Sequence, residues 1–237
     1  MKKIMKTLMG TTAAMALVLS ASTTTYAAVK PAQHQVHTKT VKTVSLAQQQ
    51  ARAMGSLSGV LPWYENTGTS IPEGHTPDYS QYNLLSVAQK GDIIYESKGG
   101  YGITGHCAIV EGKFYDEPTG QWYIRMIEST APGTIRGILE ETCANKWDVH
   151  LLRVPNATKE QIDGAVDFCI GQLGTTYNLD FAHDYSADEK DWYCSELVWA
   201  AYYNQGIDIE TKGILNEPGI TPRDIYRNKN LTEINFK

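Results

Sequence analysis

The chain has 237 residues, of which 42% are hydrophobic and 20% charged, and its formal net charge is −5. The first 44 residues hold six lysines and no acidic residue, so the remainder carries 15 Lys and Arg residues against 26 Asp and Glu residues. This acidic balance argues against a nucleic-acid partner and favours a substrate that carries amines. Without those 44 residues, about 190 remain, enough for one domain with a sizeable core.

The first 27 residues have the layout of a secretory signal peptide. Lysines open the chain, a modest apolar run follows, and small residues surround Ala27. The run is well short of the roughly 20 residues that span a bilayer, so we expect cleavage near Ala27 and no transmembrane anchor. The basic stretch 28–44 is interpreted as a linker, and 45–237 as the domain. We therefore expect a secreted or extracytoplasmic protein, whose basic linker would suit association with an acidic cell wall.

The first half of the domain is predicted to contain a β-sheet. A short helix is expected at 45–54, and the Gly-, Pro-, Ser- and Thr-rich stretch 55–83 is an irregular lead-in or a flap over a site. Four β-prone runs follow, separated by turn signals, and they predict an antiparallel sheet. The runs are DIIYES at 92–97, HCAIVEG at 106–112, QWYIRMIES at 121–129 and DVHLLRV at 148–154.

Residues 158–174, TKEQIDGAVDFCIGQLG, predict an amphipathic helix. Thr158 and Gln161 match a capping box, and Gly174 ends the pattern. Cys169 lies on the apolar stripe, so we expect it to face the core as a small hydrophobic residue.

The last part of the chain predicts one further helix start and one strand. Thr221 and Pro222 match a cap followed by the first helical residue, and LTEINF at 231–236 is β-prone. Helices and an antiparallel sheet together give an α+β fold class.

Cys194 stands near the start of a helix, in DWYCSELVWAAYYNQG at 191–206. Together with Leu197, Val198 and Ala201 it falls on one helical stripe, which favours a buried structural thiol. Its place in the first helical turn favours a nucleophile instead, because the free N–H groups and the helix dipole stabilise a thiolate there. Both readings stay open on this segment alone.

A thiolate nucleophile needs a base, and His106 is the best candidate among six histidines. It follows the glycine-rich SKGGYGITG and begins a predicted strand. By alternation His106, Ala108 and Val110 share one face. If that face packs on the Cys194 helix, His106 is directed at the helix and Cys107 points away. The alternative is a partly exposed histidine at a strand end.

Glu128 supplies a possible third member, because it ends the otherwise apolar face of the strand at 121–129. A carboxylate there needs a partner, and the imidazole of His106 one strand away would serve. Glu128 would then orient the ring and stabilise its charged form. Alternatively the strand ends there and Glu128 reaches water.

Several segments resemble one known family. They are G-D-I-I-Y at 91–95, G-H-C-A-I-V-E-G at 105–112, a strand ending in Glu128, and Y-C-S-E-L-V-W-A-A-Y at 193–202. In this order they resemble the circularly permuted branch of the NlpC-type papain-fold cysteine peptidases, the YiiX/YebB-like group, over roughly residues 85–230. The resemblance implies a permuted papain-like fold, in which an antiparallel sheet packs against a helix that carries the cysteine at its N-terminus.

The resemblance also implies roles for single residues. Cys194 would be the nucleophile, His106 the base and Glu128 the orienting residue. G-T-T-Y at 174–177 resembles a motif whose tyrosine assists the oxyanion, so Tyr177 is a candidate for that role. Tyr193 stands where ordinary members have Asp before the cysteine, and Glu196 where they have Gly. The pocket beside the thiol should therefore differ, with Tyr193 as a candidate substrate contact.

We therefore expect an exported cysteine hydrolase that cleaves an amide bond, in a cell-wall-derived peptide or another amine-bearing substrate, without a metal or other cofactor. Permuted papain folds also occur in lecithin:retinol acyltransferase-like proteins, so lipid acyl hydrolysis or transfer is an alternative. A non-catalytic secreted binding domain is another, and it predicts disulfides among the four cysteines. The spacings show no C-x-x-C pair, which makes a zinc site a weak hypothesis.

Overall fold

The structure, a computed structural model, describes residues 69–99, 105–211 and 219–237. All of them belong to one unit, Lys39–Lys237. The expected signal peptide, the linker and the helix at 45–54 lie outside the described residues, as does the part of the lead-in before residue 69.

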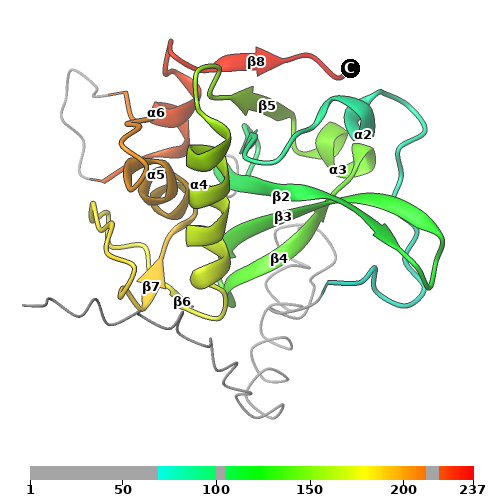
Figure 1. Ribbon diagram of the computed structural model, residues 1–237, viewed down its shortest axis with the longest axis horizontal. Helices are drawn as coiled ribbons and strands as arrows, with labels where there is room; N and C mark the ends of the chain where they lie inside the picture. The colour runs from blue at the N-terminus through cyan, green and yellow to red at the C-terminus, as the bar shows by residue number, and fades with distance from the viewer. Residues whose placement is uncertain (1–68, 100–104, 212–218) are drawn as a thin grey trace, which may run out of the picture. The chain divides into compact units, whose positions relative to one another are not determined.

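A six-stranded sheet forms the centre of the described structure, with strand order β4-β3-β2-β1-β5-β8 (Figure 1). Every neighbouring pair in it is antiparallel, which confirms the predicted antiparallel sheet. The strands are β1 (Ile93–Glu96), β2 (His106–Asp116), β3 (Gln121–Thr130), β4 (Gly133–Leu139), β5 (Val149–Arg153) and β8 (Thr232–Ile234).

Five of these strands match the β-prone runs of the sequence, and β4 was not predicted. Its sequence GTIRGIL contains two glycines and an arginine, which weaken the strand signal. All seven residues of the strand are buried all the same, and Arg136 pairs with the buried Glu111 of β2. Arg125 of β3 pairs with the same carboxylate, so the charges are compensated inside the sheet.

Two of the helices begin at the capping signals that the sequence predicts. In α4 the side chain of Thr158 accepts from the backbone N–H of Gln161, and the predicted capping box is present. Thr221 caps α6 and Pro222 is its first residue, as expected. The helices are α2 (Leu84–Val87), α3 (Glu141–Lys146), α4 (Lys159–Gly171), α5 (Cys194–Tyr203) and α6 (Pro222–Tyr226).

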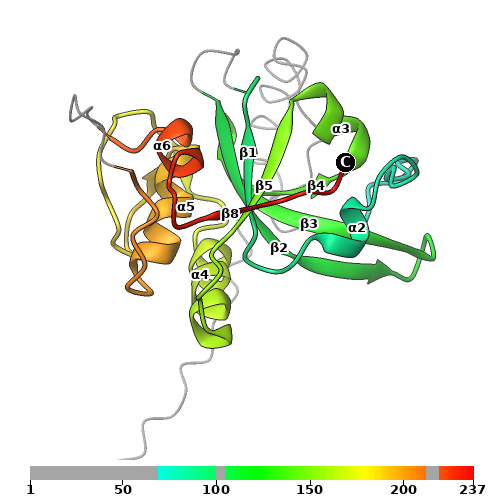
Figure 2. The same ribbon diagram turned by 90° about the horizontal axis from the view of Figure 1, so that it is seen from above.

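Helices cover both faces of the sheet. Figures 1 and 2 show α4, α5 and α6 over one face, whereas α2 and α3 lie on the other side. Cys107 and Ile109 of β2 belong to the core cluster that contains residues of α4 and α5. Ala108 and Val110 belong to the cluster that contains residues of α2 and α3. The expectation that Ala108 and Val110 pack on the Cys194 helix is therefore wrong.

α5 is a central helix rather than an amphipathic surface helix. Nine of its ten residues, from Cys194 to Tyr202, are buried. A helix that is apolar around most of its circumference is enclosed by its neighbours, here the sheet, α4 and α6. Ser195, its second residue, is also buried, and its hydroxyl donates to the carbonyl of Ile220 at 2.6 Å. None of the described helices has both the length and the apolar character needed to cross a membrane.

Candidate active site

Cys194 is the first residue of α5, and Tyr193 is the N-cap. The sulfur of Cys194 lies beside the start of β2, where it accepts a hydrogen bond from the backbone N–H of Cys107. Although burial opposes it, the pKa of Cys194 is lowered by the charge of His106, by a hydrogen bond with that ring and by the Cys107 N–H. The free N–H groups of the first helical turn add to these stabilising contacts. These contacts favour the thiolate form of the sulfur.

His106, the first residue of β2, lies between Cys194 and Glu128. Its Nε2 is 2.6 Å from Oε2 of Glu128, whose side chain is 3% exposed, against 14% for His106. Burial opposes a charged ring, yet the Cys194 thiolate and the carboxylates of Glu128 and Glu96 raise the pKa of His106 well above its ordinary value. The imidazolium form is therefore favoured.

Three residues named from the sequence thus meet at one end of the sheet, from β2, β3 and the start of α5. Because Nε2 of His106 faces Glu128, Nδ1 is the ring nitrogen left for the sulfur of Cys194. A thiolate, an imidazolium and a buried carboxylate that contact one another in this order can carry out nucleophilic attack followed by proton transfer.

Tyr177, the last residue of the short strand β6 (Thr176–Tyr177), is half-buried close to the site. β6 pairs in parallel with β7 (Asp191–Trp192), which leads directly into α5. Burial, and next the charge of Cys194, raise the pKa of Tyr177 well above its ordinary value, so the phenol keeps its proton. A phenol in this position can donate a hydrogen bond to an oxyanion formed near the sulfur.

The side chain of Tyr193 is buried and does not have the position expected of a substrate contact. It is 1% exposed, and its hydroxyl donates to the carbonyl of Ala182 at 2.7 Å and accepts from the N–H of Ile220 at 2.9 Å. Both backbone partners anchor chain segments to the start of α5. The side chain therefore serves the structure around Cys194, and we do not retain it as a substrate contact.

The other three cysteines have different surroundings. All four are free thiols in the structure, so it contains none of the disulfides that a binding domain stapled by them would need. Burial, the first cause in each case, raises the pKa of the buried thiols Cys107, Cys143 and Cys169. Within the described ranges, no three His, Cys, Asp or Glu side chains are grouped as metal ligands.

Two acidic residues near Cys194 were not assigned a role from the sequence. Glu96 ends β1 directly opposite His106, and Glu196 lies in the first turn of α5. Alternation places Glu96 on one face with Ile94, but only the pairing register shows that this face meets His106. For Glu196 the sequence shows only a departure from the family pattern.

Comparison with known proteins gives the family. A family model described as permuted papain-like amidase enzyme, YaeF/YiiX, C92 family, matches residues 87–234. The crystal structure described as metalloprotein yiiX from Escherichia coli O157:H7 is similar at 18% sequence identity and a TM-score of 0.43, over 63% of this chain and 97% of that one. No curated protein matches. Because the family model spans more than half of its residues, the chain belongs to the family of permuted papain-like amidases, YaeF/YiiX type, C92.

Proposed function

We propose that this chain is an exported cysteine hydrolase that cleaves an amide bond through Cys194, His106 and Glu128. The observation that carries the proposal is the contact series at the start of α5. The sulfur of Cys194 hydrogen-bonds to His106, and His106 lies 2.6 Å from Glu128. Membership of an amidase family supports the amide as the bond that is cleaved.

The first half of the reaction forms an acyl-enzyme. The Cys194 thiolate attacks the carbonyl carbon, which forms an S–C bond and moves the carbonyl electron pair to oxygen. The phenol of Tyr177 and N–H groups at the start of α5 stabilise that oxyanion. The C–N bond then breaks, and the His106 imidazolium gives its proton to the leaving amine.

The second half releases the acid. His106, now neutral, takes a proton from water, whose oxygen attacks the thioester carbon. Collapse of this second oxyanion breaks the S–C bond and restores the thiolate beside the imidazolium. Glu128 keeps the ring oriented and stabilises its charge in both halves. Its 3% exposure supports this role, because a dehydrated carboxylate interacts strongly with a neighbouring charge.

Export and the class of substrate rest on the sequence. The proposed signal peptide, residues 1–27, and the basic linker lie outside the described residues, and they support secretion. The acidic balance of the rest of the chain supports a substrate that carries an amine, such as a peptide with lysine or another diamino acid. A wall-derived peptide satisfies both features.

The experiment combines thiol labelling with a substrate screen. Iodoacetamide labelling of Cys194, followed by peptide mass spectrometry from pH 4 to 10, should be rapid well below the roughly 8.5 of a free thiol. His106→Ala should slow labelling at pH 6 by at least about 100-fold, because burial raises the thiol pKa and the variant loses the charge and the hydrogen bond of His106, the two largest opposing effects. His183→Ala, at an exposed histidine that contacts Glu210 instead, is the matched control and should leave the rate unchanged.

Turnover is measured in parallel on short peptide amides and on a short-chain phospholipid. Cys194→Ala should abolish hydrolysis while the protein stays folded, whereas Cys169→Ala, at a core thiol on α4, should keep it. Hydrolysis by folded Cys194→Ala would rule out the mechanism. Cleavage of the phospholipid alone would replace the amidase proposal with the lipid alternative.

A further inference from the structure

His106 has a second carboxyl group beside it. In the β1–β2 pair Glu96 lies directly opposite His106, so the two side chains project from the same face of the sheet. Glu128 approaches the same histidine from β3, on the other side of β2. His106 is therefore flanked by a carboxyl group on each neighbouring strand.

The backbone at Gly99 shows how closely Glu96 and His106 approach. A Cβ atom built on Gly99 would lie 2.5 Å from Cβ of His106 and 3.1 Å from Oε2 of Glu96. The carboxyl oxygen and the base of the histidine side chain thus adjoin the same small volume. Only a glycine leaves that volume free, so the turn after β1 encloses the two groups together.

Glu96 is also shielded from water. It is 8% exposed, and its other strand partner is the apolar Val149 of β5. The described titratable groups that interact with its charge are, first, His106 and Cys107 on β2, and then Glu128 on β3 and Cys143 on α3. His106 is the one cation in this set, so it is the group that an ionised Glu96 stabilises.

We propose that Glu96 is a positioning residue of the site, a second carboxylate that stabilises the His106 imidazolium from β1 while Glu128 holds the ring from β3. This inference rests on the proposed function, because it acts through His106. Glu96 makes no bond to the substrate. Its effect is to keep the thiolate and imidazolium pair intact to higher pH.

The ionisation of Glu96 limits its effect to one side of the pH range. Burial raises the pKa of Glu96 to about 7, with the His106 charge opposing this rise and the Glu128 charge adding to it. Below that pH Glu96 is neutral and resembles a glutamine, so Cys194 ionises as it would without the charge. Above it the carboxylate favours the protonated ring, and His106 loses its proton only at higher pH.

The test is Glu96→Gln in the protein without residues 1–27, with Glu233→Gln as the matched control. Glu233 lies on β8 and bonds to a different histidine, since its Oε1 is 2.6 Å from Nδ1 of His150. NMR of the histidine ring carbons gives the deprotonation midpoint of each ring, and iodoacetamide labelling gives the midpoint for Cys194. We expect Glu96→Gln to lower the His106 midpoint by about one pH unit without moving the Cys194 midpoint. Glu233→Gln should leave the His106 and Cys194 midpoints unchanged.

The outcomes of this test distinguish the role of Glu96 from the proposed hydrolase. An unchanged His106 midpoint, or equal shifts of the His106 and Cys194 midpoints, would overturn the role of Glu96 and leave the proposed hydrolase standing. If Glu96→Gln does not fold, the wild-type His106 signal decides, since it must show a separate inflection near pH 7 as Glu96 ionises. A flat wild-type signal there refutes the inference. Failure of wild-type Cys194 to react below pH 8 would overturn the hydrolase and this inference together.

Discussion

The sulfur of Cys194 is nearly as buried as those of Cys107 and Cys169, yet its pKa is shifted in the opposite direction. Burial raises the pKa of the latter two thiols, as expected for a charge moved out of water. Cys194 experiences the same penalty, and the charge of His106 together with the Cys107 N–H outweighs it. The lowered pKa of Cys194 therefore comes from its neighbours on β2, and burial alone does not identify a structural thiol.

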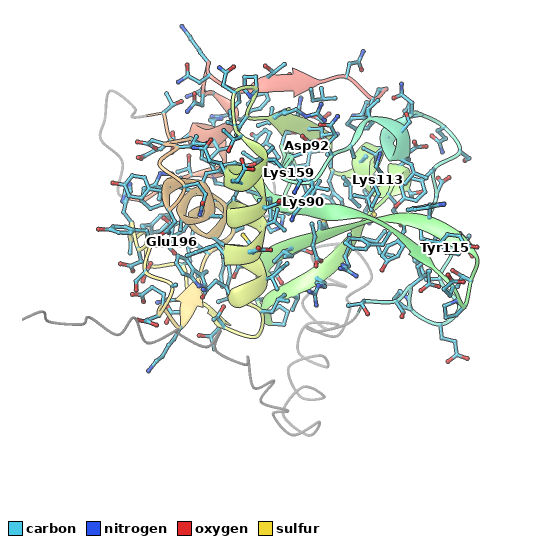
Figure 3. The ribbon with its side chains drawn as sticks, in the orientation of Figure 1. Lys90, Asp92, Lys113, Tyr115, Lys159 and Glu196 are labelled. Atoms are coloured by element: carbon cyan, nitrogen blue, oxygen red, sulfur yellow. The ribbon has the colours of Figure 1, made fainter. Side chains whose placement is uncertain are left out.

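Glu196 connects the start of α5 to the loop that precedes it. It is buried, and its carboxyl accepts from the N–H of Asp184 at 3.0 Å and from the N–H of Tyr193 at 3.4 Å. Figure 3 labels this side chain at α5. Since Tyr193 also holds Ala182 through its hydroxyl, two residues that flank Cys194 fix the same loop.

The first prediction concerns Glu196→Gln. Burial raises the pKa of Glu196 to about 8, with the two backbone N–H groups opposing this and the charges of Asp180 and Asp184 adding to it. The folded state therefore keeps a proton that the unfolded state releases near pH 4.3, so this contribution to stability is fully present below pH 4.3 and is lost as the pH rises through 8. Between pH 5 and 9 the free energy of unfolding of Glu196→Gln should rise relative to wild type by about 1 to 3 kcal/mol.

Urea unfolding at both pH values measures this difference. Glu117→Gln, at an exposed position in the turn between β2 and β3, is the control for the chemical change itself. A difference between Glu196→Gln and wild type that stays constant with pH would show that Glu196 titrates alike in both states.

At the scale of elements, α3 holds the segment before α2 through one side chain. Glu141 is fully buried at the first position of α3. Its carboxylate accepts from the backbone N–H groups of Gln81 at 2.7 Å, Tyr82 at 2.8 Å and Leu84 at 3.2 Å. These donors would otherwise lack an acceptor at the entry to α2, so one carboxylate joins two short helices that are too short to be stable alone.

The second prediction follows from this contact. Glu141→Ala should lower the free energy of unfolding by about 3 kcal/mol, because backbone donors are left without a partner in a buried place. Urea denaturation measures the loss, and Glu141→Gln should lose less because its amide oxygen still accepts. Thr142→Ala, which removes the exposed hydrogen bond to Asp78, should cost less than about 1 kcal/mol. Cys194 labelling should stay rapid in all three variants. A loss for Glu141→Ala no larger than that of Thr142→Ala would contradict the role of the carboxylate.

The elements that the sequence predicted share strong local signals. The strands at β1, β2, β3, β5 and β8 have β-prone residues between turn signals, and α4 and α6 have capping boxes. α2 and α3 have four and six residues, too few for a periodic pattern, and tertiary contacts such as those of Glu141 hold them. β4 depends on the pairing of Arg136 with Glu111, which is a contact between strands and has no local signature.

Which face of β2 packs on α5 was also beyond the sequence. Alternation separates His106, Ala108 and Val110 from Cys107 and Ile109, but both sets are apolar enough to be buried. With helices on both sides of the sheet, the two faces give the same hydrophobic signal. His106 still reaches Cys194 because it is the first residue of β2, at the end of the sheet where α5 begins.

At the scale of the molecule, the candidate site depends on long-range pairing. His106 and Glu128 lie 22 residues apart in sequence, and Cys194 follows much later. Their residue types and order were enough to suggest a triad, whose roles remain our proposal. Glu96 was not identified, because its relation to His106 is a matter of strand register, and register is set by the whole sheet.

The last prediction concerns the overall charge. Beyond residue 44 the chain carries 15 basic and 26 acidic residues, so its field attracts cations. For two peptide amides that differ only in lysine or glutamate next to the cleaved bond, we expect kcat/KM to favour the lysine peptide by about 3- to 10-fold at 20 mM salt. The ratio should fall towards one at 0.5 M salt, because the Debye length is then only about a few ångströms and more distant charges are screened. A preference that survives high salt would instead indicate a specific carboxylate contact beside Cys194, and a preference for glutamate would show that overall charge does not select the substrate.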